Sequence, residues 1–167
     1  MYIKLTGTLI FDPEDKTKKH VSQSSWKKVA MIQFESSAQT NGICSYYSWF
    51  IEKRYNLKLN KPLRGAHITV INDRQSEMNG KWNEVKSMYH GKKVTVTIDL
   101  DVRTDAKHWW LRVPNELNPD LQGIRNLLGL GAPFYAFHLT LGMANEKNIE
   151  HSKYIHGLIN KFKGSYV

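Results

Sequence analysis

Two short segments of the sequence repeat one pattern of residue types that could carry out acid–base chemistry. Residues 66–70 read Ala-His-Ile-Thr-Val, and residues 137–141 read Phe-His-Leu-Thr-Leu. Seven histidines and nine threonines among 167 residues predict about 0.4 His-x-Thr triplets by chance, whereas the sequence contains two. Their histidines lie 71 positions apart (138 − 67), close to half the chain length. The repeat therefore indicates two related segments with a shared role.

The residue types in this pattern suit chemistry at a phosphate group. Alternate side chains of a strand face opposite sides, so His67 and Thr69 share one face, as do His138 and Thr140. One imidazole can accept a proton while the other donates one, and threonine hydroxyls can hydrogen-bond phosphate oxygens. Two such strands facing each other would support in-line displacement at phosphorus without a metal ion. The alternative is a structural pair of buried strand histidines that bond to neighbouring threonines.

The elements that must position these residues follow the same order in each half of the chain. Alternating and helical patterns of apolar residues, with Gly and Pro at the boundaries, define them. In the first half we expect strands over residues 2–11 and 26–34, a helix over 44–55, a strand over 66–71 and a helix over 79–89, with a polar loop at 12–25 and a turn at 36–42. In the second half we expect strands over 93–101 and 107–113, a helix over 118–128, a strand over 135–141 and a helix over 145–162.

This repeated order, strand-strand-helix-strand-helix, is typical of a duplicated α+β unit. We therefore expect an α+β fold of two pseudo-symmetric lobes, residues 1–91 and 92–167, each an antiparallel sheet with helices on its outer face. The two lobes would form a central cleft. The junction His90-Gly91-Lys92 is too short for a linker, so residues 1–167 are expected to form a single domain.

Composition narrows the class of protein and of ligand. The net charge of +9 favours a polyanionic partner such as a nucleotide or a nucleic acid. A single cysteine, Cys44, excludes an intramolecular disulfide and a cysteine-based zinc site. The other five histidines share no metal-ligand spacing with acidic residues, so we expect no metal or cofactor. No apolar run reaches the ~18–20 residues of a membrane span and no signal peptide is evident, which predicts a cytoplasmic location and no membrane partner. We also expect a monomer without an obligate protein partner.

The doubled His-x-Thr motif resembles the 2H phosphoesterase superfamily, whose signature is one such motif on each of two pseudo-symmetric lobes. Its members include 2′-5′ RNA ligase-like proteins and 2′,3′-cyclic nucleotide phosphodiesterases. The usual motif in these proteins is His-x-Thr-Leu-x-Phe. This chain has Val70 at one Leu position, and Asn72 and Met143 at the two Phe positions. These departures argue against the RNA ligase-like branch.

Residues 1–10, 123–131 and 133–142 are similar to the phage anti-CBASS phosphodiesterases. That resemblance implies metal-independent hydrolysis of 3′-5′ bonds in cyclic di- or oligonucleotide messengers such as 3′,3′-cyclic GMP-AMP. Such an activity would counteract bacterial antiphage immunity in the host cytoplasm. His67, Thr69, His138 and Thr140 are the matched catalytic positions. The alternatives are an RNA end-processing enzyme acting on 2′,3′-cyclic phosphates or 2′-5′ linkages, and a non-catalytic nucleotide sponge or RNA-binding module.

Two aromatic residues are candidates for further contacts with a substrate. Trp109 and its neighbour Trp110 face opposite sides of a predicted strand, so one belongs to the core and the other can stack on a base. Of these two, we assign Trp109 to substrate binding. Tyr135 precedes His138 by three residues, which predicts that it lies on the opposite face of the strand but near the rim of the site. Both tryptophans could instead serve packing, and Arg125 is expected on the solvated surface.

Overall fold

The computed structural model describes residues 1–13, 26–34, 38–62 and 64–163, except for the side chains of residues 38–41 and 163. Its first half contains β1 (Tyr2–Phe11), β2 (Ala30–Gln33), α1 (Ala38–Tyr55), β3 (His67–Ile71), a short 3-10 helix η1 (Gln75–Glu77) and α2 (Trp82–Tyr89). The second half contains β4 (Lys93–Thr104), β5 (His108–Arg112), a 3-10 helix η2 (Asn115–Leu117), α3 (Pro119–Leu127), β6 (His138–Met143) and α4 (Ile149–Lys163). The expected α+β class and the expected order of strands and α-helices are therefore confirmed.

The six strands within the described residues are all paired antiparallel. The strands of the first half pair in the order β1-β2-β3, and those of the second half in the order β4-β5-β6. β1 also pairs with β4 along seven residues, and β3 pairs with β6 at Ile68 and Leu139. The strands are therefore paired in a closed ring, in the order β1-β2-β3-β6-β5-β4. The two segments with the His-x-Thr pattern are thus neighbouring strands, although 71 residues separate their histidines.

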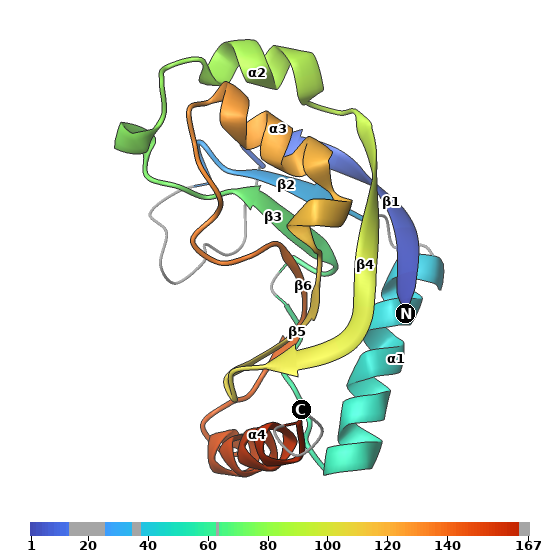
Figure 1. The fold of residues 1–167 in the computed structure, drawn as a ribbon. Helices are drawn as coiled ribbons and strands as arrows, with labels where there is room; N and C mark the ends of the chain where they lie inside the picture. Colours follow the sequence, from blue (N-terminus) through green and yellow to red (C-terminus); the bar gives the residue numbers. More distant parts are fainter. Residues whose placement is uncertain (14–25, 35–37, 63, 164–167) are drawn as a thin grey trace.

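The helices cover the apolar faces of the strands, and two of them, α1 and α3, lie against a strand of the other half of the sequence. α1 lies against β6, whereas α3 lies against β3 and α2 against β1. Figure 1 shows α2 and α3 together at one end of the molecule and α1 and α4 at the other. Ile68 and Leu139, each the second residue of its strand, are fully buried in the resulting core. Burial of each contributes about 1.5–3 kcal/mol to stability.

The boundaries of several elements differ from those expected. β1 has the expected bounds, whereas β2 is confined to Ala30–Gln33 because Lys28 adopts a positive φ of 60° in a turn before it. α1 begins at Ala38, inside the expected turn at 36–42, so that expectation is wrong from residue 38 onward. The segment from Ala38 to Gly42 has no large apolar side chain, so hydrophobic periodicity gave no signal there. Residues 14–25 of the expected loop lie outside the described residues.

Candidate active site

The four residues of the doubled motif lie together where β3 meets β6. Because Ile68 pairs with Leu139 in an antiparallel ladder, the register places His67 across from Thr140 and Thr69 across from His138. Directly opposed side chains in such a pair are about 4.5–5.5 Å apart at Cβ. The two apolar residues point into the core, and the four motif residues are partly exposed on the other face. The structure therefore brings together all four predicted residues.

Both histidines are held by the same local hydrogen bond. Nδ1 of His67 lies 2.9 Å from the carbonyl oxygen of Gly65, and Nδ1 of His138 lies 2.7 Å from that of Ala136. A carbonyl oxygen can only accept, so Nδ1 carries the hydrogen in each ring. In the neutral imidazole, Nε2 is then the nitrogen that can accept a proton. The two rings are thus fixed in equivalent tautomers, each with its basic nitrogen directed away from its own backbone.

The backbone before each histidine is anchored in an equivalent way. Ala66 and Phe137 are buried, and their carbonyl oxygens accept hydrogen bonds from the amides of Phe34 and Val113. These amides follow β2 and β5, the strands that flank the β3–β6 pair. The carbonyl that orients His67 belongs to Gly65, whose φ of +68° is one that glycine adopts without strain. Each imidazole is therefore supported by a backbone that is tied into the sheet.

β2 and β5, which flank the β3–β6 pair, place different side chains beside the two histidines. On β2, Gln33 pairs with His67 and Met31 with Thr69. On β5, Arg112 pairs with His138 and Trp110 with Thr140. The ring of Trp110 meets that of His138 edge-on, with centroids 6.3 Å apart. A cation and an indole thus lie on the His138 side, and neutral side chains lie on the His67 side.

Trp109 is not in this site, and its assignment to substrate binding is wrong. Its side chain is fully buried, its Nε1–H donates to Oγ of Ser152 at 3.0 Å, and its ring packs against Tyr55. The adjacent Trp110 faces the motif residues instead. The sequence contained the signal: His108 and Arg112 are polar and share the strand phase of Trp110, whereas Leu111 shares that of Trp109.

Tyr135 lies in the segment that joins α3 to β6, directly before the residue whose carbonyl holds His138. Its side chain is 76% exposed, and that of Phe134 is 92% exposed. The two rings meet edge-to-face with centroids 4.8 Å apart. This exposed pair stands next to the motif, and its role in substrate binding stays a prediction.

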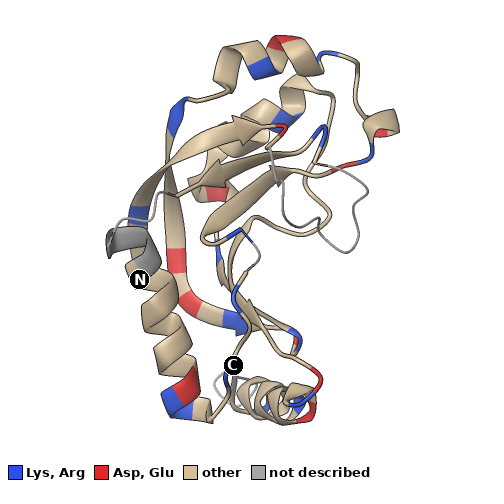
Figure 2. Cartoon of the chain, turned by 180° about the vertical axis from the view of Figure 1, so that it is seen from behind, with Lys and Arg blue, Asp and Glu red and all other residues tan. Residues whose placement is uncertain are grey.

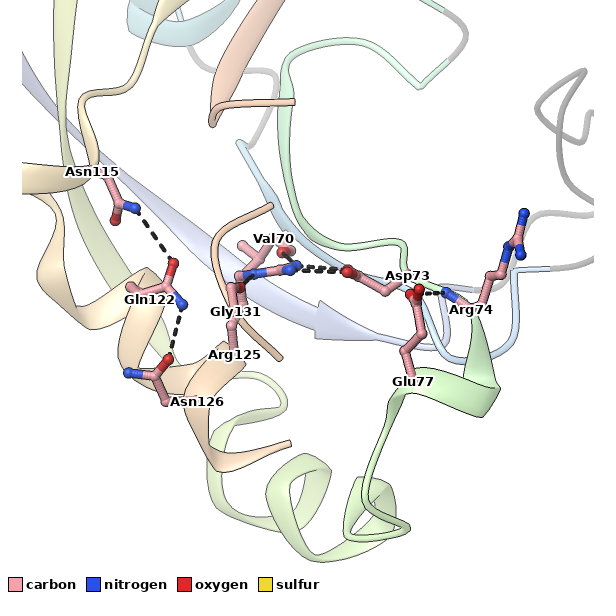
Figure 3. Close-up of polar contacts among 9 residues, drawn as sticks. All are labelled: Val70, Asp73, Arg74, Glu77, Asn115, Gln122, Arg125, Asn126 and Gly131. Carbon is pink, nitrogen blue, oxygen red and sulfur yellow. Dashed lines mark hydrogen bonds and ion pairs between the residues drawn. The ribbon is translucent and has the colours of Figure 1, made fainter. Parts of the chain in front are cut away.

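Arg125 is buried rather than solvated, which corrects the expectation from sequence. Its side chain is 1% exposed and uses all three nitrogens. Nη1 and Nη2 donate to the two carboxylate oxygens of Asp73 at 2.6 and 2.9 Å, Nη1 also donates to Val70 O, and Nε donates to Gly131 O. Figure 3 shows the guanidinium between these groups. Arg125 thus ties together the end of β3 and the segment that leads to β6.

The hydrogen bond from Arg125 also lowers the pKa of the Asp73 carboxyl below its ordinary value of 3.8, although partial burial opposes the shift. A group with a lowered pKa in the folded state stabilises the fold above its unfolded pKa, and this contribution is lost as the pH falls through the folded value. We therefore expect acid unfolding of the wild type to be steeper below about pH 4 than that of Asp73→Asn. Unfolding free energies measured between pH 6 and pH 2 would test this, and parallel profiles would contradict it.

The basic residues do not belong to a single element. Figure 2 shows Lys and Arg along helices, strands and connecting segments. Within the described ranges, no three His, Cys, Asp or Glu side chains are grouped as metal ligands would be. None of the helices drawn in Figure 1 combines the length and the apolar character needed to cross a membrane.

Comparison of the chain with protein-family models, with curated proteins and with solved structures finds no match. The interpretation of the site therefore rests on its own residues: two tautomer-matched histidines and two threonines on adjacent strands, with Arg112 and Trp110 beside them.

Proposed function

We propose that the chain is a metal-independent phosphodiesterase that hydrolyses 3′-5′ bonds of cyclic di- or oligonucleotides, such as 3′,3′-cyclic GMP-AMP, to linear products. One observation carries the proposal: the two histidines lie on neighbouring strands, and each has Nδ1 bound to the carbonyl two residues before it. A purely structural histidine pair would not need equivalent tautomers that leave Nε2 as the basic nitrogen of both rings. The expected outcome in a cell is destruction of a messenger of antiphage immunity in the cytoplasm.

The proposed reaction has two steps. In the first, Nε2 of one histidine removes the proton of a ribose 2′-hydroxyl, whose oxygen attacks the adjacent phosphorus. The bond between phosphorus and the 5′-oxygen breaks, and the other histidine, in its protonated form, donates a proton to that oxygen. In the second step, water opens the resulting 2′,3′-cyclic phosphate while the two histidines exchange roles. Thr69 and Thr140, as their neighbours across the strand pair, would hold the phosphate oxygens.

A two-lobed architecture with a central cleft belongs to this proposal. Its support is the matched pairing of the two halves: β2 and β5 flank the two motif strands, and Gln33 and Arg112 occupy equivalent positions beside the two histidines. A pseudo-two-fold axis between β3 and β6 would relate His67 to His138 and Thr69 to Thr140. The two proton-transfer groups would then approach a phosphate from its two sides, as in-line displacement requires.

The test is an incubation of purified protein in EDTA with 3′,3′-cyclic GMP-AMP and, separately, with a short RNA that ends in a 2′,3′-cyclic phosphate. Products are separated by ion-exchange chromatography. Opening of the cyclic dinucleotide supports the proposal. Conversion of the RNA end alone would identify an RNA-processing enzyme instead. Recovery of both substrates intact but bound would identify a nucleotide-binding protein and contradict the enzyme assignment.

Tyr135 is expected to contact a base of the bound nucleotide. Stacking of a base on an aromatic ring contributes about 1–3 kcal/mol, so Tyr135→Ala should raise KM by roughly tenfold with little change in kcat or stability. Tyr154→Ala is the matched control, since Tyr154 is also largely exposed but lies on α4. Equal KM values for wild type and Tyr135→Ala in steady-state kinetics would exclude this contact.

A further inference from the structure

Arg112 lies beside His138 on the face that carries the motif. It ends β5, pairs directly with His138 of β6, and pairs on its other side with Asp99 of β4. Paired residues of antiparallel strands project to the same side of the sheet. The guanidinium therefore shares the face of the two histidines and the two threonines.

The equivalent position on the opposite side is neutral. Gln33 ends β2 and pairs with His67, just as Arg112 ends β5 and pairs with His138. The two halves thus match in histidine, threonine and tautomer, but they differ in charge at this position. If this position served only to stabilise the fold in both halves, there would be no reason for an arginine in one half and a glutamine in the other.

The contacts of Arg112 leave the Nη donors at the end of its side chain available to a ligand. Its Nη2 lies 3.8 Å from Oδ2 of Asp99, which is longer than the 2.7–2.9 Å of a charge-assisted hydrogen bond. Its Nε is buried and has no hydrogen-bond partner among the described residues. The side chain remains 40% exposed, while that of Asp99 is only 11% exposed. Asp99 accepts a hydrogen bond from the amide of Asp101, and this bond holds its carboxylate next to the guanidinium.

We infer that Arg112 is a further catalytic residue, which binds the non-bridging oxygens of the reacting phosphate beside His138. The inference rests on the proposed function, because it concerns the same phosphate. In-line displacement concentrates negative charge on these oxygens in the transition state, and the two threonines donate only neutral hydrogen bonds to them. A guanidinium supplies a fixed positive charge with a planar set of donors that matches phosphate. Asp99, which pairs with Arg112 from the neighbouring strand β4, orients this guanidinium.

The inference is tested with Arg112→Gln, which copies the residue of the opposite half, and with Arg112→Lys. We expect kcat on 3′,3′-cyclic GMP-AMP to fall by roughly 10²- to 10³-fold in Arg112→Gln, as for loss of one donor to a transition-state oxyanion. Arg112→Lys should recover only part of this loss, because an ammonium lacks the planar fork. Arg54→Gln on α1 removes the same charge outside the site and is the control. A kcat of Arg112→Gln within threefold of the wild type would overturn the inference.

A second measurement separates this inference from the proposed function. If the wild type cleaves neither nucleotide substrate, the proposed function fails. The anion site can still be tested by titration with guanosine 3′-monophosphate, with the NMR signals of His138 as the measure of binding. We then expect Arg112→Gln to bind at least tenfold more weakly than the wild type. Equal binding by the two proteins, or no binding by either, would overturn the assignment of Arg112.

Discussion

Replacement of His67 or His138 by alanine is expected to lower kcat on a cyclic dinucleotide by about 10²- to 10⁴-fold, the usual contribution of a positioned acid or base. Each histidine has its Nδ1 bound to a backbone carbonyl, so each variant removes one Nε2 from the reaction. Since both roles are needed in every turnover, the two variants should be similarly impaired. The double variant should be little worse than either single one, because residues that act as a unit are not additive.

Steady-state kinetics in EDTA, with thermal unfolding of each variant, would check this result. His156→Ala is a matched control, because His156 lies on α4 and contacts Asn160 outside the strand face. Thr69→Val and Thr140→Val keep the shape of the site and should give smaller losses. If either histidine variant retained more than a tenth of the wild-type kcat, the two-histidine mechanism would be wrong.

Replacement of Arg125 by methionine is expected to reduce the free energy of unfolding by about 3–5 kcal/mol, the usual cost of breaking a buried ion pair on one side. The change removes the guanidinium donors from the carboxylate of Asp73 and from the carbonyl oxygens of Val70 and Gly131. It also releases the end of β3 from the segment that precedes β6. A weaker site should accompany the weaker fold, since this side chain anchors the end of β3 and the segment that leads to β6.

Denaturant unfolding of wild type, Arg125→Met, Asp73→Asn and the double variant would measure the coupling between the two residues. We expect the double variant to be more stable than the sum of the single losses implies, because it leaves no unpaired charge. Arg54→Met, at an exposed position of α1, controls for the loss of an arginine in itself. A loss below 1 kcal/mol in Arg125→Met would contradict the structural role described above.

Local pattern was sufficient to predict most elements of the fold. β1 was predicted to the residue, because period-two alternation in residues 2–11 is a property of the strand alone. The order of strands and α-helices in both halves followed in the same way. Prediction failed at the start of α1, since Ala38 to Gly42 have no apolar stripe to reveal the helix.

The candidate site was predicted only in part. Alternation correctly placed His67 with Thr69 and His138 with Thr140, because side-chain direction in a strand follows from backbone geometry. It also required one of Trp109 and Trp110 to be buried, but the choice between them was wrong. Arg125 was misplaced on the surface, because its carboxylate partner Asp73 lies 52 residues away in the sequence.

Residues close together in the chain were therefore enough to predict the order of the elements, the repeat of the His-x-Thr pattern and the strand face on which each motif lies. The folded structure was needed to show that β3 and β6 are neighbours, that Arg125 joins the end of β3 to the segment before β6, and that Arg112 lies beside His138. The reason is physical. Strand phase and helix periodicity depend on residues close in the chain, whereas strand pairing and buried hydrogen bonds depend on which distant surfaces are buried together.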